Sequence, residues 1–96
     1  MDPFFSICSC QVVVFSKSYC QYCAMTKSLF SKSEFNGLKV KVIELDQIKS
    51  GNDIQSTLVS MTGQRTVPSV WVKGTFLGGN DDTQRAYKSG KLQSML

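Results

Sequence analysis

A chain of 96 residues with 42% hydrophobic and 19% charged side chains has the composition of one globular domain, neither disordered nor membrane-spanning. The net charge of +4 comes from scattered basic residues, so nucleic acid is not an expected partner. The longest mostly apolar stretch, residues 4–15, is too short to cross a bilayer, and no secretory signal is apparent. We therefore expect residues 1–96 to form one soluble, cytoplasmic domain that is a monomer and binds no membrane.

The first half of the chain predicts a strand, a helix and a second strand. Gln11–Phe15 is short, β-branched and apolar, which is typical of a buried strand, and Val40–Leu45 has the same character. Between them, helical spacing of apolar residues predicts a helix over Gln21–Lys32, followed by an Asn36–Gly37 turn. The apolar stripe of this helix is predicted to be Tyr22, Met25, Leu29 and Phe30.

The second half predicts a helix, a hairpin and a third helix. A capping loop at residues 50–52 precedes a helix that ends near Gly63, and residues 92–96 form a short tail. The apolar positions of this second helix are Ile54, Leu58 and Met61. The hairpin strands are Ser69–Val72 and Thr75–Leu77, and any of residues 80–82 can cap the third helix, which ends near Gly90.

The predicted element order is β-α-β-α-β-β-α. A strand, helix and strand in succession favour a right-handed crossover and a parallel pair, and the later hairpin adds an antiparallel pair. The sequence therefore predicts an α/β fold with a mixed four-stranded sheet flanked by helices.

The absence of histidine excludes Cys-His and Ser-His nucleophile pairs and histidine-based zinc sites. Four cysteines, Cys8, Cys10, Cys20 and Cys23, allow a disulfide-stapled secreted domain, a four-cysteine zinc site, or a redox C-x-x-C with two further thiols. The apolar content argues against the first interpretation, and the C-x-C spacing of the first pair argues against the second. We therefore expect no metal ion, and we expect Cys8 and Cys10 to be dispensable for catalysis.

The C-x-x-C motif directly follows the first predicted strand and opens the first predicted helix. Unpaired N–H groups at a helix N-terminus stabilise an anion, so the Cys20 thiolate is the predicted nucleophile. Lys17 can add positive charge nearby. Cys23 lies one turn further on, and we expect its more enclosed thiol to resolve mixed disulfides. The alternative is that both are buried structural cysteines.

Tyr22 and two further segments can contribute to a binding site. Tyr22, between the cysteines, can pack under the loop or flank a substrate. Val67–Pro68 opens a strand, where proline is often cis and leaves a backbone edge free for an extended substrate, although a plain turn proline is the alternative. Residues 78–82 place two glycines before a helix, where N–H groups can bind a carboxylate and Asp81 an ammonium group, or where Asn80 or Asp81 only caps the helix.

Three segments together resemble the signature segments of the dithiol glutaredoxin family, in order and in spacing: FSKSYCQYC at residues 15–23, TGQRTVP at residues 62–68 and GGNDDT at residues 78–83. The resemblance covers roughly Gln11 to the C-terminus. It implies a thioredoxin-like fold and glutathione-dependent reduction of glutathionylated proteins and disulfides. Cys20 would attack the disulfide, and a second glutathione or Cys23 would release the product.

The resemblance also implies a glutathione site. Its residues would be Lys17, Tyr22, Gln64, Arg65, Thr66, Val67, Pro68, Gly79, Asn80 and Asp81. Lys17, Gln64 and Arg65 are expected near the glycine carboxylate, and the Thr66–Val67 segment near the cysteine backbone. Asn80 and Asp81 are expected near the γ-glutamyl end.

Three features depart from the family pattern. Gln21 replaces the proline common between the cysteines, Asn80 replaces a common cysteine after two glycines, and the N-terminal segment carries Cys8-x-Cys10. The first departure leaves room for a rival function, a dimer that carries a [2Fe–2S] cluster through Cys20 of each chain and two glutathiones.

Overall fold

The structure, a computed structural model, describes residues 11–96. Cys8 and Cys10 lie outside the described residues. Within residues 11–96, no helix has the length and apolar character that crossing a membrane requires.

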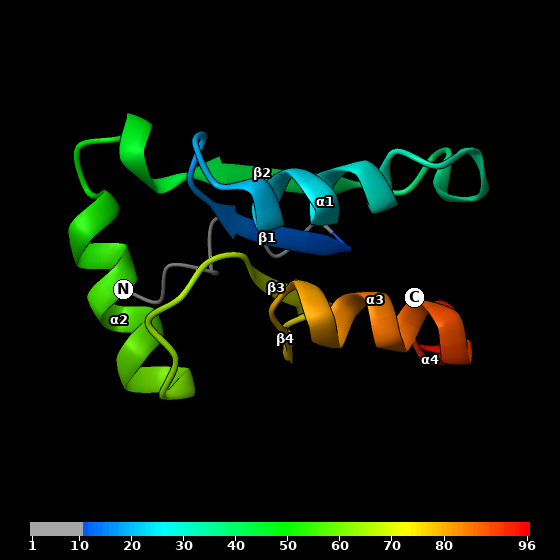
Figure 1. Cartoon of the computed structure of the whole chain (residues 1–96). Coiled ribbons are helices and arrows are strands. Elements are labelled where there is room, and N and C mark those ends of the chain that lie inside the picture. Colours follow the sequence, from blue (N-terminus) through cyan, green and yellow to red (C-terminus); the bar gives the residue numbers. More distant parts are fainter. Residues whose placement is uncertain (1–10) are drawn as a thin grey trace.

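Four strands form one sheet in the order β2-β1-β3-β4 (Figure 1). Their bounds are Val12–Ser16 for β1, Val40–Glu44 for β2, Ser69–Val72 for β3 and Thr75–Gly78 for β4. β1 pairs in parallel with β2 and antiparallel with β3, and β3 and β4 form an antiparallel hairpin. The predicted mixed four-stranded sheet is confirmed: β3 has the predicted bounds, and the ends of the other strands differ by at most one residue.

The helices are α1 at Gln21–Phe30, α2 at Gly51–Thr62, α3 at Asn80–Ser89 and α4 at Lys91–Met95, with short 3₁₀ turns η2 at Ser33–Phe35 and η3 at Leu45–Gln47. Alternate residues of the central strands feed two cores, as the two-residue period of a strand requires. Val12 and Val14 pack with residues of α1, α3 and α4, whereas Val13 and Phe15 pack with Leu58 of α2. The sheet is therefore covered on both faces, and its central strand β1 is buried throughout.

The buried face of α1 differs from the predicted stripe. Tyr22 and Met25 are 53% and 48% exposed, and Cys23, Thr26, Leu29 and Phe30 are the buried residues. Thr26 can be buried at low cost because its hydroxyl donates to Asn80 Oδ1 at 2.9 Å, which also links α1 to α3. The face of α1 that carries Cys23 therefore packs inward. Tyr22, between the two cysteines in sequence, is exposed at the surface.

α2 begins at Gly51, whereas the sequence predicted residues 50–52 to be a capping loop. Ser50 is the N-cap residue but forms no side-chain capping bond. Gly51 is buried, and a Cβ atom there would lie 1.8 Å from the Leu45 carbonyl oxygen, so only glycine permits this contact between η3 and α2. Met61, predicted to lie on the apolar face of this helix, is 48% exposed, whereas Leu58 is buried and Ile54 packs beside it.

Candidate active site

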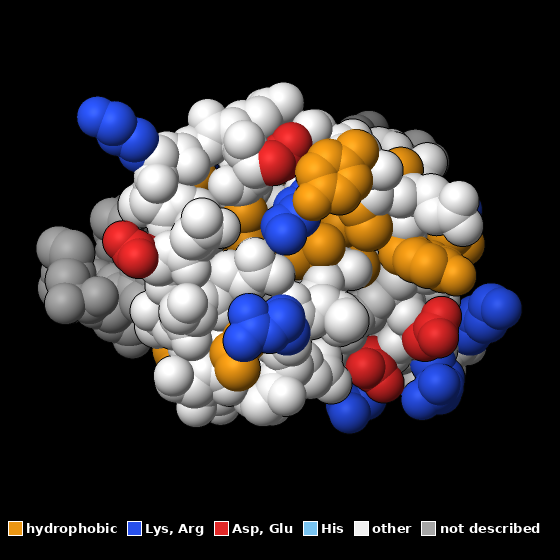
Figure 2. Space-filling model, turned by 60° about the vertical axis from the view of Figure 1, so that its left-hand side comes forward, with side chains coloured by type: hydrophobic (Ala, Val, Ile, Leu, Met, Phe, Trp, Pro, Cys, Tyr) orange, Lys and Arg blue, Asp and Glu red, His pale blue; other side chains and the backbone are white. Residues whose placement is uncertain are grey.

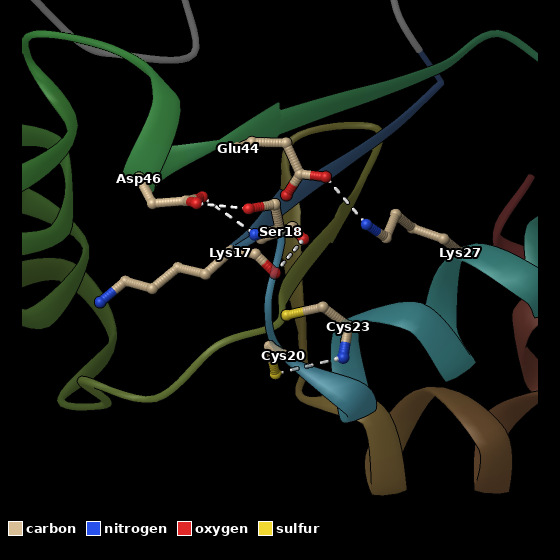
Figure 3. A network of polar contacts seen from close by, with 8 residues as sticks. Lys17, Ser18, Cys20, Cys23, Lys27, Glu44 and Asp46 are labelled. Carbon is tan, nitrogen blue, oxygen red and sulfur yellow. Dashed lines mark hydrogen bonds and ion pairs between the residues drawn. The ribbon is translucent and has the colours of Figure 1, made fainter.

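Cys20 is the N-cap residue of α1, at the end of the short loop that leaves β1 (Figure 3). Its backbone is extended, and its Sγ atom accepts a hydrogen bond from the Cys23 N–H at 3.3 Å. The sulfur also lies 3.8 Å from the Val67 carbonyl oxygen. The predicted position of this sulfur at the start of the helix is confirmed.

The surroundings of Cys20 favour its thiolate. Partial burial alone would raise the pKa of Cys20, but hydrogen bonds outweigh it and hold the pKa below the ordinary value of 9.0. The donors are the Cys23 thiol and the N–H groups of Cys23 and Tyr22, and the Lys27 ammonium adds a smaller favourable effect. This is the environment of a thiol nucleophile.

Cys23 has the opposite surroundings. Its side chain is 0% exposed, and burial raises the pKa of its thiol above 9.0. Hydrogen bonds from the Lys17 N–H and the Ser16 hydroxyl lower the pKa without cancelling the effect of burial. Cys23 therefore stays protonated where Cys20 is poised to ionise, as a resolving thiol should.

The cation that acts on Cys20 is not the predicted one. Figure 3 shows the Lys17 side chain extending away from both sulfurs, and only its backbone N–H contributes, to Cys23. The charge that lowers the Cys20 pKa belongs to Lys27. Lys27 follows Cys23 by four residues, so helical periodicity would have placed it on the same face of α1.

A carboxylate tethers the loop before Cys20. Asp46, in η3, accepts hydrogen bonds from the Ser18 N–H at 2.9 Å and from the Ser18 hydroxyl. These two bonds hold the pKa of Asp46 below its ordinary value of 3.8. The end of β2 is thereby connected to the loop that positions Cys20, a contact the sequence did not predict because the partners are 28 residues apart.

A groove of about 320 Å³ lies beside the dithiol, between the start of α1, the segment before β3 and the start of α3. Its lining residues are Tyr22, Gln64, Thr66, Val67, Pro68, Gly79, Asn80, Asp81 and Asp82. The Val67–Pro68 peptide bond is cis, as expected. Asp82 is the lining residue that the sequence did not assign to the site.

Two residues predicted at the glutathione site do not line this groove. Neither Lys17 nor Arg65 is among its lining residues, and Arg65 is exposed. The Arg65 carbonyl oxygen accepts a hydrogen bond from Gln55 Nε2 at 2.8 Å, which fastens the segment before β3 to α2.

The start of α3 is capped by Asp82, one of the three residues that the sequence allowed as a cap. Gly79 is the N-cap residue, and Asp82 Oδ2 accepts from its N–H at 3.3 Å. Asn80 is not a cap: it is 6% exposed, and its Oδ1 accepts from Thr26 and Gln84. Since Asp82 performs the capping, Asp81 stays exposed at the mouth of the groove.

The rim of this site is partly apolar. Figure 2 shows hydrophobic side chains gathered in a band on the face that includes α2, with basic side chains in and beside it. Tyr19 and Tyr22, on either side of Cys20, are among the most exposed large hydrophobic residues of the described chain. A docking polypeptide would therefore meet aromatic surface next to the thiol.

No described residues form a group of three or more Cys, Asp or Glu that could hold a metal ion.

A mixed sheet with a C-x-x-C at a helix N-terminus, facing a cis-proline, defines a dithiol protein of the thioredoxin-like α/β class. The glutaredoxin family model matches residues 12–77, and the chain belongs to the glutaredoxin family. It is 52% identical over 85 residues to human "Glutaredoxin-2, mitochondrial", covering 88% of this chain and 50% of the human protein. It is 42% identical to "Glutaredoxin-1" of Saccharomyces cerevisiae, covering 90% of this chain and 79% of the yeast protein.

The fold matches solved glutaredoxin structures, which confirms the thioredoxin-like prediction. A buckwheat glutaredoxin–glutathione complex superimposes with a TM-score of 0.83 at 44% identity, covering 94% of this chain and 79% of the other. The chain nevertheless spans only about half the length of the human relative.

Proposed function

We propose that this protein is a glutathione-dependent thiol–disulfide oxidoreductase. The Cys20 thiolate attacks the sulfur of a glutathionylated protein or a small disulfide, and the bond that forms leaves glutathione on Cys20. A second glutathione then releases it, or Cys23 resolves a mixed disulfide with a protein and leaves Cys20 and Cys23 joined. The observation that carries this proposal is the geometry of the pair: Cys20 is the partly exposed N-cap residue whose sulfur accepts from the Cys23 N–H at 3.3 Å, and Cys23 is fully buried one turn further on.

The groove supports glutathione as the co-substrate. It begins at Tyr22 and Val67, beside Cys20, and ends at the N-terminus of α3. Free N–H groups there suit a carboxylate, and exposed Asp81 suits the ammonium group of a γ-glutamyl residue. The relative solved as a glutathione complex supports the same assignment.

A comparison of two substrates tests this function. In one substrate, the cysteine of a peptide is joined to glutathione by a disulfide; in the other, the same peptide is joined to free cysteine. We expect the protein to reduce the glutathione disulfide faster than the cysteine disulfide, because the groove binds the γ-glutamyl and glycine ends of glutathione. Equal rates would refute the glutathione site, and no release from either peptide would refute the oxidoreductase activity.

The iron–sulfur carrier is the second candidate. Cys20 is the partly exposed thiol of the described chain, so one chain offers one cysteine ligand and a cluster would need two chains. Anaerobic purification with glutathione tests it: a coloured dimer would support the carrier function, and a colourless monomer would support the oxidoreductase alone. The monomeric state and a cytoplasmic location stay predictions.

A further inference from the structure

Asn80, the first residue of α3, is a buried polar side chain held from two helices. It is 6% exposed, and its Oδ1 accepts hydrogen bonds from the Thr26 hydroxyl of α1 at 2.9 Å and from Gln84 Nε2 of α3 at 3.2 Å. An amide oxygen has two lone pairs, so both are in use. The Asn80 amide therefore cannot turn over without breaking the bond to Thr26 and the bond to Gln84.

The other half of the same amide is free. Both side-chain hydrogen bonds of Asn80 go to Oδ1, and within residues 11–96 its Nδ2 makes none. Among these residues, Glu44 Oε1 is the one buried side-chain oxygen or nitrogen without a hydrogen-bond partner, so Asn80 Nδ2 is not sealed off from solvent. Asn80 lines the groove beside the dithiol. Its N–H groups are therefore open to the groove, where they can donate to an acceptor on a ligand.

These N–H groups stand at the start of α3, where the backbone already favours an anion. The first N–H groups of a helix have no partner within the helix, and the helix dipole places positive charge there. Asp82 occupies the N–H of Gly79 but leaves the Asn80 side chain free. The cysteine common at this position in the family would offer only a weak S–H donor. The replacement by asparagine therefore adds a strong donor beside the backbone N–H groups.

We propose that Thr26 is a positioning residue for glutathione. Together with Gln84, it holds the Asn80 amide so that Nδ2 donates to the γ-glutamyl carboxylate. Thr26 is completely buried and does not touch the ligand, and it lies on the same face of α1 as Cys23. The helix that carries the thiols thus also sets a donor at the far end of the groove. This role rests on the proposed function, because it assumes that the groove binds glutathione.

Two disulfides of one peptide test this role. In the first, the peptide cysteine is joined to glutathione. In the second, it is joined to 4-aminobutyryl-cysteinylglycine, which lacks only the α-carboxylate of the γ-glutamyl residue. We expect the wild type to have a lower KM for the first disulfide and a similar kcat for both, because the carboxylate is bound alike in the ground and transition states.

Two single variants should remove this preference. Asn80→Ala removes the donor and should raise the KM for the glutathione disulfide about tenfold, the effect of one hydrogen bond to a charged group, with little change in kcat. Thr26→Val keeps the volume but loses the hydroxyl, and should raise it by a smaller factor because Gln84 still holds the amide. Neither variant should change the KM for the analogue. Thr26→Ser, which keeps the hydroxyl, should restore the wild-type KM.

The double variant Thr26→Val, Asn80→Ala shows whether Thr26 acts through Asn80. Its KM for the glutathione disulfide should equal that of Asn80→Ala alone, because Thr26 then has no amide to hold. Additive effects of the two substitutions would mean that Thr26 affects the groove by another route, and would overturn the proposal.

Matched variants separate positioning from stability. Thr83 is also completely buried, but its hydroxyl donates within α3 to the Gly79 carbonyl oxygen. Thr83→Val should therefore lower the melting temperature and leave both KM values unchanged. Gln84→Met removes the second anchor of Asn80 from a partly exposed position, so it tests the same orientation if Thr26→Val does not fold. It should raise the KM for the glutathione disulfide alone.

The outcomes distinguish this role from the proposed function. An unchanged preference in Asn80→Ala and in the anchor variants, or an equal rise in KM for both disulfides, would overturn the role of Thr26 and leave the oxidoreductase intact. A wild type without any preference would refute the γ-glutamyl site together with this role. Failure to reduce either disulfide would refute the oxidoreductase activity and everything that rests on it.

Discussion

Cys20 and Cys23 are the same residue type on the same turn of α1, but the protein treats them in opposite ways. Cys20 is a partly exposed N-cap whose sulfur accepts helix N–H bonds, and these lower its pKa. Cys23 faces the sheet with no exposed surface, and burial raises its pKa. The comparison teaches that three positions at the start of one helix separate a thiol that ionises readily from one that stays protonated, through desolvation and the number of hydrogen-bond donors.

Removing either sulfur gives the largest expected effect. Cys20→Ser should reduce turnover of glutathione mixed disulfides to the uncatalysed rate, because no other described thiol is exposed to substrate. Cys23→Ser should retain this activity, since a second glutathione can release the product, but should lose reduction of protein disulfides. Steady-state assays with both substrates check this. Comparable glutathione-linked activity in the two variants would contradict the division of roles.

The two aspartates at the start of α3 offer a similar comparison. Asp81→Ala should raise the KM for glutathione roughly ten- to a hundredfold with little change in kcat, because a charged hydrogen bond is worth about 1.5–3 kcal/mol and acts in ground and transition states alike. Asp82→Ala should instead lower the free energy of unfolding by about 1 kcal/mol, because Asp82 caps Gly79.

Thermal melts run beside the kinetics separate these effects. If Asp81→Ala melted lower than the wild type and bound glutathione normally, Asp81 would be structural and the γ-glutamyl assignment would fail at that end of the groove.

Much of this architecture is encoded locally and could be predicted. The β-branched run of β1, the C-x-x-C after it and the glycines that end the hairpin each fix a nearby element. The buried stripe of α1 could not be read in this way. Thr26 is buried only because Asn80, distant in sequence, accepts its hydroxyl hydrogen.

The charged residues around the thiols also divide into those that the local sequence predicts and those that depend on contacts between distant segments. Lys17 is near Cys20 in sequence, but the loop turns its side chain away, while Lys27 acts from the next turns of α1. The Asp46–Ser18 and Glu44–Lys27 contacts join β2 and the turn after it to the active-site segment. Such contacts depend on the parallel register, which the sequence predicted only as a pairing and not residue by residue.

The pH dependence of alkylation sharpens the thiol comparison. In Cys23→Ser, iodoacetamide should react with Cys20 with an apparent pKa below 9.0, because helix N–H groups stabilise the thiolate. In Cys20→Ser, Cys23 should react slowly and with an apparent pKa above 9.0, because its thiolate is desolvated. Mass spectrometry of the products against pH measures both values, and equal values would show that position does not distinguish the sulfurs.

The opposite pKa shifts of Cys20 and Cys23 also predict opposite effects of pH on the stability of the fold. The lowered pKa of Cys20 means that its ionisation stabilises the fold fully above the unfolded value of 9.0, and this contribution is lost as the pH falls through the folded pKa. The raised pKa of Cys23 contributes stability below 9.0 that is lost as the pH rises through the folded pKa. Urea unfolding of each serine variant against the wild type, from neutral to alkaline pH, should show differences of opposite slope.

The smallest expected effect concerns the tether behind the nucleophile. Asp46→Asn should slightly lower the melting temperature at neutral pH, because an amide is a weaker acceptor than a carboxylate for the Ser18 N–H and hydroxyl. The folded pKa of Asp46 is lowered from 3.8, so the stabilisation is present above 3.8 and is lost as the pH falls through the folded value. The difference between Asp46→Asn and the wild type should therefore vanish in acid.

A second variant separates the tether from a general effect of charge. Ser18→Ala keeps the N–H bond to Asp46 but removes the hydroxyl, so its melting temperature should fall between those of Asp46→Asn and the wild type. Both variants should also slow alkylation of Cys20 slightly, because a looser loop holds the sulfur less firmly against the N–H groups of α1. If Asp46→Asn stayed less stable than the wild type at every pH down to acid unfolding, the ionised carboxylate would not be the source of the stabilisation, and the contact would be one of packing alone.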